Sequence, residues 1–239
     1  MTNKTYLIFG ISKGLGKVLT QTIPADRDKV YGISRSKPAY LETHKNVEWI
    51  SADLSNPSQS SEQLKKHIGQ NTIDYLIYNV GIWENNGFSN DYKFEDTPKD
   101  EIVNMVNTNI SSCILAIQAF IENLKKAENA KIILIGSTWA LDNHNGKEVT
   151  FSATKFALRG ITHSLRENLR DYNIGVAVLN IGTLATKPGF KESGDSIIEK
   201  TNGGIPLQDV IRAVKFILST SGATCVKEIN MPAMKDSNI

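Results

Sequence analysis

The 239-residue sequence predicts an α/β fold in which a doubly wound parallel sheet of about seven strands carries helices on both faces. Short apolar runs alternate with amphipathic stretches from one end of the chain to the other. The connections are long enough for helical crossovers, which parallel strands require. Doubly wound sheets often reach this size as one unit, so the pattern favours a single domain over residues 1–239.

The expected strands are short runs rich in β-branched and aromatic residues. In chain order they are Thr5–Phe9, Lys29–Ile33, Val47–Ser51, Ile73–Tyr78, Lys131–Gly136, Gly175–Leu179 and Val226–Met231. The helices expected between them have apolar residues three or four positions apart. They are Leu15–Ile23, Ser58–Ile68, Lys99–Lys126, Thr150–Tyr172 and Leu207–Ser219.

Two polar stretches, Trp83–Pro98 and Lys187–Gly204, follow the fourth and sixth expected strands. In open α/β sheets, ligands bind outside the carboxyl ends of the strands. Both stretches are therefore expected to extend beyond the sheet and to form the rim of a substrate site.

Composition argues against several classes of partner. The 27 Lys and Arg residues nearly balance the 25 Asp and Glu residues, which gives a formal net charge of +2. A nucleic acid or a membrane recognised by bulk electrostatics is therefore not expected. Cys113 and Cys225 are expected to be buried thiols of a reducing compartment, with neither a disulfide nor a metal site. The polar N-terminus and the lack of a run of 18 apolar residues favour a cytoplasmic protein.

The first expected strand ends in a glycine-rich loop, Gly10-Ile11-Ser12-Lys13-Gly14-Leu15-Gly16, and a helix follows it. Glycine is needed where the chain turns tightly, where backbone amides approach phosphates, and where the helix packs on the strand. The helix N-terminus directs a partial positive charge toward a bound anion. The loop therefore predicts a site for the pyrophosphate of a nicotinamide dinucleotide.

The GxxxGxG spacing resembles that of the short-chain dehydrogenase/reductase family, and further landmarks of that family follow in its order. Asp53-Leu54 resembles the pair whose carboxylate meets the adenine amino group, and Asn79-Val80-Gly81 resembles the Asn-Ala-Gly that ends the fourth strand. Gly182 and Thr186 match the glycine and threonine that clasp the nicotinamide carboxamide. The resemblance covers nearly the whole chain. It implies a Rossmann-type domain, a homodimer or homotetramer, and hydride transfer between a nicotinamide cofactor and a small carbonyl or alcohol substrate.

The second expected strand is followed by Ser34 and Arg35, where an NAD enzyme typically carries an Asp or Glu for the ribose 2′-hydroxyl. A carboxylate would repel a 2′-phosphate, whereas a guanidinium binds one with two parallel hydrogen bonds. Arg35, together with Lys13, therefore predicts NADP(H) rather than NAD(H). The residues expected to contact the cofactor are Gly10, Ser12, Lys13, Gly14, Leu15, Gly16, Ser34, Arg35, Asp53, Leu54, Asn79, Val80, Gly81, Lys155, Gly182 and Thr186.

The resemblance also implies a reaction centre. In the family, a Tyr-x-x-x-Lys pair transfers the proton, a serine binds the substrate carbonyl, and a helix asparagine holds a water in a proton relay. Here the pair reads Phe151-Ser152-Ala153-Thr154-Lys155, so phenylalanine stands at the tyrosine position. The matching serine is Ser137, which fits the strand end better than its neighbour Thr138, and the asparagine is Asn109. The expected catalytic set is thus Asn109, Ser137, Phe151 and Lys155.

Three interpretations of Phe151 remain open. The chain is an engineered variant of an ordinary reductase, a natural enzyme with another proton source, or a non-catalytic NADP(H)-binding sensor or interaction protein. In each of them, phenylalanine retains the ring but loses the hydroxyl that donates the proton. General acid–base catalysis is worth roughly 10² to 10⁴ in rate, so carbonyl reduction is expected to be impaired or altered.

The substrate side is expected to include a lid near residues 183–205. The stretch after the fourth expected strand contains four aromatic residues, Trp83, Phe88, Tyr92 and Phe94. These rings either form an aromatic wall of the substrate site or pack on one another as a closed loop.

Overall fold

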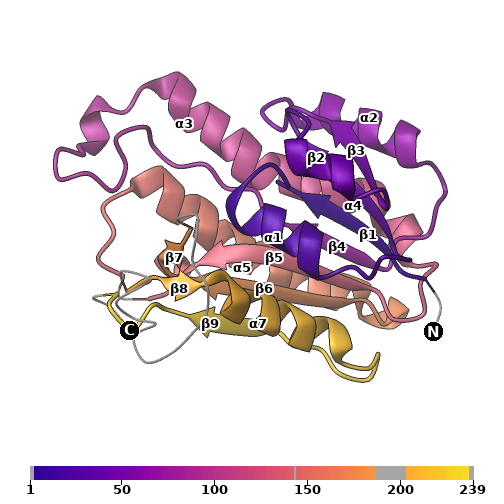
Figure 1. The fold of residues 1–239 in the computed structure, drawn as a ribbon. Coiled ribbons are helices and arrows are strands. Elements are labelled where there is room, and N and C mark those ends of the chain that lie inside the picture. Colours follow the sequence, from indigo (N-terminus) through magenta and orange to yellow (C-terminus); the bar gives the residue numbers. More distant parts are fainter. Residues whose placement is uncertain (1–2, 143, 187–202, 237–239) are drawn as a thin grey trace.

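The apolar runs of the sequence form the strands of one parallel sheet. The computed structural model describes residues 3–142, 144–186 and 203–236. The strands are β1 (Thr5–Phe9), β2 (Lys29–Ser34), β3 (Val47–Ser51), β4 (Tyr75–Tyr78), β5 (Lys131–Ser137), β6 (Gly175–Ile181) and β9 (Glu228–Met231). They lie in the order β3-β2-β1-β4-β5-β6-β9, and all neighbouring pairs are parallel (Figure 1). The predicted doubly wound α/β fold is confirmed.

The chain winds outward from the centre of the sheet in both directions, so the strand order reverses between β1 and β4. At such a switch point the connections that follow the two neighbouring strands diverge and leave a crevice at the strand ends. The glycine loop follows β1, and Asn79 follows β4. The topology therefore places both of these predicted cofactor motifs at the crevice.

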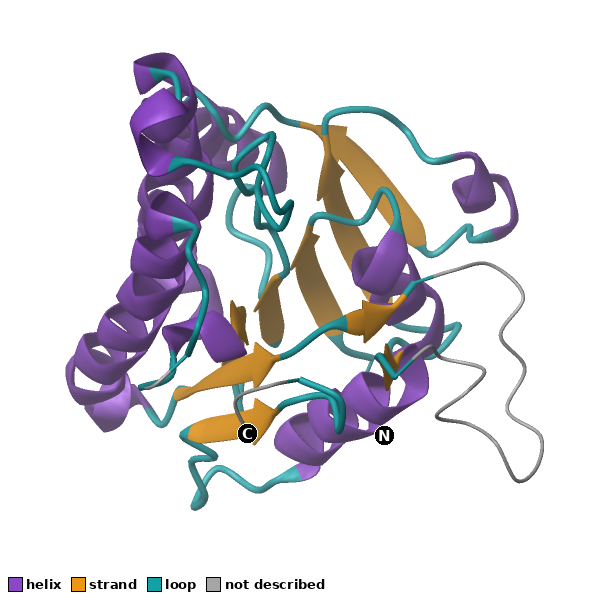
Figure 2. Cartoon of the chain, turned by 90° about the vertical axis from the view of Figure 1, so that its left-hand side faces the viewer, coloured by secondary structure: helices purple, strands orange, loops and turns teal. Residues whose placement is uncertain are grey.

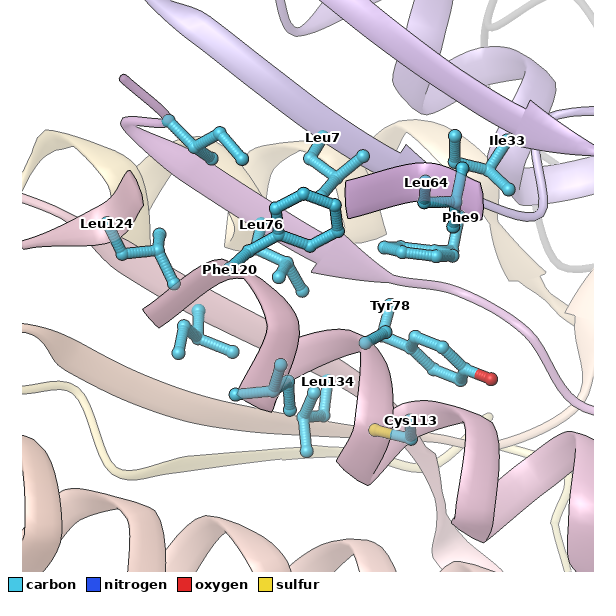
Figure 3. Close-up of a cluster of buried hydrophobic side chains, with 14 of the residues drawn as sticks. Leu7, Phe9, Ile33, Leu64, Leu76, Tyr78, Cys113, Phe120, Leu124 and Leu134 are labelled. Carbon is cyan, nitrogen blue, oxygen red and sulfur yellow. The ribbon is translucent and has the colours of Figure 1, made fainter. Parts of the chain in front are cut away.

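Helices cover both faces of the sheet (Figure 2). They are α1 (Gly14–Thr22), α2 (Pro57–Ile68), α3 (Lys99–Val106), α4 (Ser112–Leu124), α5 (Val149–Leu169) and α7 (Leu207–Ser219). Alternate residues of β1 point to opposite faces. Leu7 and Phe9 lie in the buried cluster that includes residues of α2, α4 and α5, as the close-up in Figure 3 shows for part of it. Tyr6 and Ile8 lie in the cluster that includes residues of α1 and α7.

The single helix expected over Lys99–Lys126 is interrupted. A π-helical segment, Asn107–Ser111, separates α3 from α4, and the last turn ends at Leu124. The buried Tyr78 hydroxyl donates to the Thr108 carbonyl oxygen at 2.8 Å, and the Ser112 hydroxyl donates to the same oxygen at 2.7 Å. Both side chains thus bind a carbonyl oxygen inside the widened turn. The segment is stabilised by a strand-end tyrosine, which a local helical pattern does not reveal.

The helical run Lys99–Leu124 is long and apolar enough to cross a membrane by length and composition alone. Its most apolar window has a mean hydropathy of 1.2, and 39% of that window is buried within the fold. Ala116, Ile117 and Phe120 of α4 belong to the core cluster against the sheet. Burial of this face accounts for much of the apolar composition of the run.

Several element ends differ from the expected ones. β4 begins at Tyr75 rather than Ile73, because the Asp74 carboxylate turns back to accept from the Thr5 amide and the Lys4 ammonium, each at 2.9 Å. β9 begins at Glu228, so Cys225 lies in the preceding connection and is exposed. The expectation that both cysteines are buried is therefore wrong for Cys225 and confirmed for Cys113.

The chain after β6 forms a second, smaller sheet. β7 (Leu184–Ala185) pairs in parallel with β8 (Ile205–Pro206). The two strands are the ends of the expected lid near residues 183–205. Most of that expected lid, residues 187–202, lies outside the described residues.

Candidate active site

The glycine loop after β1 has the geometry of a tight turn against a neighbouring strand end. Gly10 has a φ of 82°, and a Cβ placed there would lie 3.0 Å from the Asn79 carbonyl oxygen. A Cβ on Gly16 would overlap the Gly10 carbonyl oxygen. Side chains at these two positions would force α1 away from β1. The glycines therefore bring the N-terminus of α1 close to the crevice, where its amides can face an anion.

A cleft of about 710 Å³ lies over the ends of β1 to β4. Of the residues expected to contact the cofactor, those that line it are Gly10, Ser12, Lys13, Gly14, Leu15, Ser34, Arg35, Asp53, Leu54, Asn79, Val80, Gly81 and Thr186. The three others, Gly16, Lys155 and Gly182, are not among its lining residues. The cleft thus joins predicted residues from widely separated segments of the chain.

The cleft also has lining residues that the sequence reasoning missed: Ile33, Ala52, Ser55, Ile82, Trp83, Asn104 and Thr108. Asn104 and Thr108 are four positions apart, so they share one helix face. The pair stands among other polar residues of the same run, so nothing in the sequence singles it out. Trp83 belongs to the aromatic stretch after β4, and its position beside the cofactor motifs depends on how that loop folds.

At one end of the cleft, polar groups surround the positions expected to face the adenosine. The Ser34 hydroxyl donates to the Ser36 carbonyl oxygen at 2.9 Å and accepts from the Trp49 indole at 3.0 Å. Asp53 accepts from the amide and the hydroxyl of Ser55, at 3.1 and 2.9 Å. Ser34 therefore has no free hydrogen-bond donor, whereas the neighbouring Arg35 lines the cleft with a cationic side chain.

Lys155 is buried on the inner side of α5, one turn after Phe151. Its ammonium donates to the Ile135 carbonyl oxygen at 3.2 Å and lies 5.5 Å from the centroid of the Phe151 ring. Desolvation by burial lowers the pKa of Lys155 to about 8. A Cβ on Gly81 would lie 2.8 Å from this ammonium, so the absence of a side chain at Gly81 leaves the space it occupies.

The other members of the expected catalytic set are buried and hydrogen-bonded. The Ser137 hydroxyl, at the end of β5, accepts from the Trp139 amide at 3.2 Å. Asn109 lies in the π-helical segment, and its amide group donates to the Ile82 carbonyl oxygen at 2.8 Å and to the Thr154 hydroxyl at 3.0 Å. Asn109 thus connects the loop after β4 to α5. None of Asn109, Ser137, Phe151 and Lys155 is among the residues that line the cleft.

Residues 4–193 match the family described as short chain dehydrogenase. The chain belongs to the short-chain dehydrogenase/reductase family. It is 27% identical over 234 residues to the 3-oxoacyl-acyl-carrier-protein reductase FabG of Escherichia coli (strain K12), covering 92% of this chain and 91% of that protein. The family match and the doubly wound parallel sheet agree with each other. The chain is therefore a member of a family of oxidoreductases.

Solved structures support the same fold. A short chain dehydrogenase family protein from Francisella tularensis superimposes with a TM-score of 0.78 at 21% identity, covering 97% of this chain and 98% of that one. A tyrosine-to-phenylalanine variant of ElxO with NADPH bound gives a TM-score of 0.78 at 20% identity, covering 97% of this chain and 98% of the other.

In this short-chain dehydrogenase/reductase, the loop after β4 is fixed to α5 by two buried glutamates. The Glu84 carboxylate accepts from the amides of Thr150 and Phe151, at 2.9 and 3.2 Å, in the first turn of α5. The Glu148 carboxylate, just before α5, accepts from the Phe88 amide at 2.6 Å. Each carboxylate leaves one oxygen buried without a hydrogen-bond partner among the described residues. We call this pair, Glu84 and Glu148, the glutamate clamp.

The clamp was not predicted. An acidic residue next to a helix N-terminus is favourable, so the position of Glu148 was a weak signal. Glu84 gave none, because its role depends on the loop folding back over α5.

The loop places two aromatic rings over Phe151. Phe88 contacts Trp83, Trp139 and Phe151, with ring centroids 5.8, 4.9 and 5.5 Å away. Trp83 and Trp139 also contact Phe151, at 6.4 and 6.0 Å. We call these four residues the aromatic cluster.

Of the four aromatic residues noted in this stretch, Trp83 and Phe88 lie over the reaction centre. Tyr92 is buried, and its hydroxyl accepts from the Val149 amide at 3.4 Å, beside the glutamate clamp. Phe94 is 46% exposed in a short 3₁₀ turn, Phe94–Asp96, and takes no part in the cluster. Trp83 and Phe88 pack on each other and on Phe151. The aromatic wall of a substrate site stays a prediction.

Proposed function

We propose that this short-chain dehydrogenase/reductase binds NADP(H) across the strand ends and that Phe151 stands where the family's proton-donating tyrosine stands. The observation that carries the proposal is the pairing of Phe151 with Lys155. The two residues are one helical turn apart on α5, and the ammonium lies 5.5 Å from the ring centroid. Gly10 to Gly16, Asn79 to Gly81, Lys155, Gly182 and Thr186 would hold the dinucleotide, which supplies or accepts a hydride when bound.

The residues of the chain then account for only part of the chemistry of carbonyl reduction. The Ser137 hydroxyl, which accepts from the Trp139 amide at 3.2 Å, can donate its own proton in a hydrogen bond to a substrate oxygen. Phe151 has no proton to transfer. Reduction of a small aldehyde or ketone is therefore expected to be slow in this chain, by roughly 10² to 10⁴ relative to a site with a phenol.

The choice of cofactor is tested by reversing the charge of Arg35. Arg35→Glu is expected to weaken NADPH binding about tenfold or more, because a charge-assisted bidentate pair is replaced by repulsion of the 2′-phosphate. NADH lacks that phosphate, so its affinity should change little. Calorimetric titration of both nucleotides against both proteins measures this, with exposed Lys66→Glu on α2 as the control for net charge. Equal affinities of the parent protein for NADPH and NADH would contradict the assignment.

A second candidate function is a non-catalytic NADP(H)-binding sensor or interaction protein. Two observations favour it: Phe151 has no hydroxyl, and the aromatic cluster covers the reaction centre. Restoring the phenol separates the two functions, and the expected result is given in the Discussion.

We also infer a cytoplasmic homodimer or homotetramer, paired through α4 and α5 as the family resemblance implies. Exposed apolar side chains on these helices support this, since Ile114 is 44% exposed and Phe156 is 37% exposed. Light scattering on the purified chain is expected to give two or four times the 26.4 kDa of one chain. A mass of one chain at all concentrations would contradict this inference.

A further inference from the structure

The ring of Phe88 lies among the other three rings of the aromatic cluster. It contacts all three of the others at centroid distances of 4.9 to 5.8 Å. The interplanar angles are 73° to Trp83, 72° to Trp139 and 80° to Phe151. Edge-to-face contacts of this kind are the favoured arrangement of aromatic pairs. Trp83, Trp139 and Phe151 thus form a receptor for one phenyl ring, and Phe88 shows how such a ring fits.

The backbone of Phe88 is held in an unfavourable conformation. Its φ is 63°, in the left-handed region that side chains with a Cβ rarely adopt. The Glu148 carboxylate binds its amide at 2.6 Å, and the turn before it is closed by the Gly87 amide donating to the Glu84 carbonyl oxygen at 2.8 Å. Strain of this kind occurs at ligand clamps and switch regions. The ring of Phe88 is also 51% exposed, so it gains only part of the benefit of burial.

The cluster lies between solvent and the reaction centre. Phe151 is 7% exposed and Ser137 is 8% exposed, whereas Trp83 is 54% exposed and also lines the cofactor cleft. A substrate that reaches Phe151 from the loop side must therefore contact the cluster. Because Phe88 has the least favourable backbone and is half exposed, it is the ring that can yield.

We infer that Phe88 occupies the place of an aromatic ring of the substrate, so that the substrate is a neutral aryl carbonyl or aryl alcohol whose ring displaces Phe88. This inference rests on the proposed function, because it assumes that the substrate reacts beside Phe151. A cationic guest fits less well, since the Lys155 ammonium already lies 5.5 Å from the Phe151 centroid and would repel it. A saturated ring lacks the polarised edge and face on which edge-to-face packing depends.

The test compares two ketones of the same carbon skeleton, acetophenone and cyclohexyl methyl ketone, by ligand-observed NMR titration of the full chain. NADP⁺ is present in one series and absent in the other, so that no hydride is available and turnover does not interfere. The variant is Phe88→Gly, which removes the ring and also suits the left-handed backbone, so that the fold is expected to be retained. The control is Phe94→Ala, a half-exposed phenylalanine of the same loop outside the cluster.

Phe88→Gly is expected to raise the affinity for acetophenone about tenfold, because the ligand no longer competes with an attached ring. Phe88→Gly should change the affinity for cyclohexyl methyl ketone less than about threefold. Phe94→Ala should change the affinity for neither ketone. In the Phe88→Gly background, Trp139→Ala should lower acetophenone affinity by about threefold or more, the loss of one aromatic pair.

Three results would overturn the inference: unchanged acetophenone affinity in Phe88→Gly, an equal gain for both ketones, or displacement of acetophenone by NADP⁺, which would assign the ring site to the nicotinamide. A chain that binds acetophenone as expected but never binds NADP⁺ would instead contradict the proposed function. The two failures are therefore distinguishable.

Discussion

Phe151→Tyr is expected to raise the rate of NADPH-dependent carbonyl reduction at least about a hundredfold. The substitution adds one oxygen to a ring that already lies one turn before Lys155, whose ammonium is 5.5 Å from the ring centroid. A cationic neighbour favours the ionised phenol and lowers its pKa, so the new hydroxyl would be a proton donor suited to neutral pH. The loss of NADPH absorbance with a panel of aldehydes and ketones measures the rate.

The matched control is Phe216→Tyr, which adds the same oxygen to a phenylalanine of α7 that is 55% exposed. It should leave the rate unchanged. If Phe151→Tyr binds NADPH tightly but turns over no member of the panel, the sensor function is favoured and the catalytic proposal fails.

Lys155→Met is expected to stabilise the protein in the absence of nucleotide by about 3 kcal/mol at neutral pH. Burial lowers the pKa of Lys155 to about 8, against 10.5 for an unperturbed lysine. Below pH 8 the ammonium is charged in both the folded and the unfolded chain, so its desolvation cost is fully present. Between pH 8 and 10.5 the unfolded chain binds the extra proton, and stability rises with pH.

Urea unfolding at pH 7 and at pH 9.5 measures this effect as the difference between the parent and Lys155→Met, which removes the contributions of other titrating groups. The difference should shrink at the higher pH. Lys66→Met, an exposed substitution on α2, should show no such trend. A Lys155→Met protein less stable than the parent at pH 7 would contradict this prediction. Contacts of the ammonium in the fold would then offset its desolvation cost. Because burial of the ammonium lowers the stability of the fold, we expect Lys155 to serve nucleotide binding or chemistry rather than stability.

Local patterns predicted much of the fold. β1, β3 and α7 begin and end at the expected residues, because each is a run of residues that favour its secondary structure, with clear boundaries. The widened turn at Asn107–Ser111 was not predictable in the same way. It depends on the Tyr78 hydroxyl reaching the Thr108 carbonyl across 30 positions of sequence.

The candidate site likewise has a part that local patterns predict and a part that depends on contacts between distant segments. The glycine loop, Asn79 and Arg35 follow strand ends, so topology alone brings them to one cleft. The glutamate clamp and the aromatic cluster depend on the loop after β4 folding back onto α5, and no periodic pattern encodes that path. Trp139 lies in a 3₁₀ turn, Thr138–Ala140, and its ring meets Phe88 from a segment about 50 positions away.

The central claim is that one nicotinamide dinucleotide binds over the ends of β1 to β4, and calorimetric titration of the purified chain with NADPH tests it most directly. We predict saturable binding of one NADPH per chain, with a dissociation constant below about 1 mM, and weaker binding of NADH. The absence of saturable binding by either nucleotide at that concentration would contradict the account.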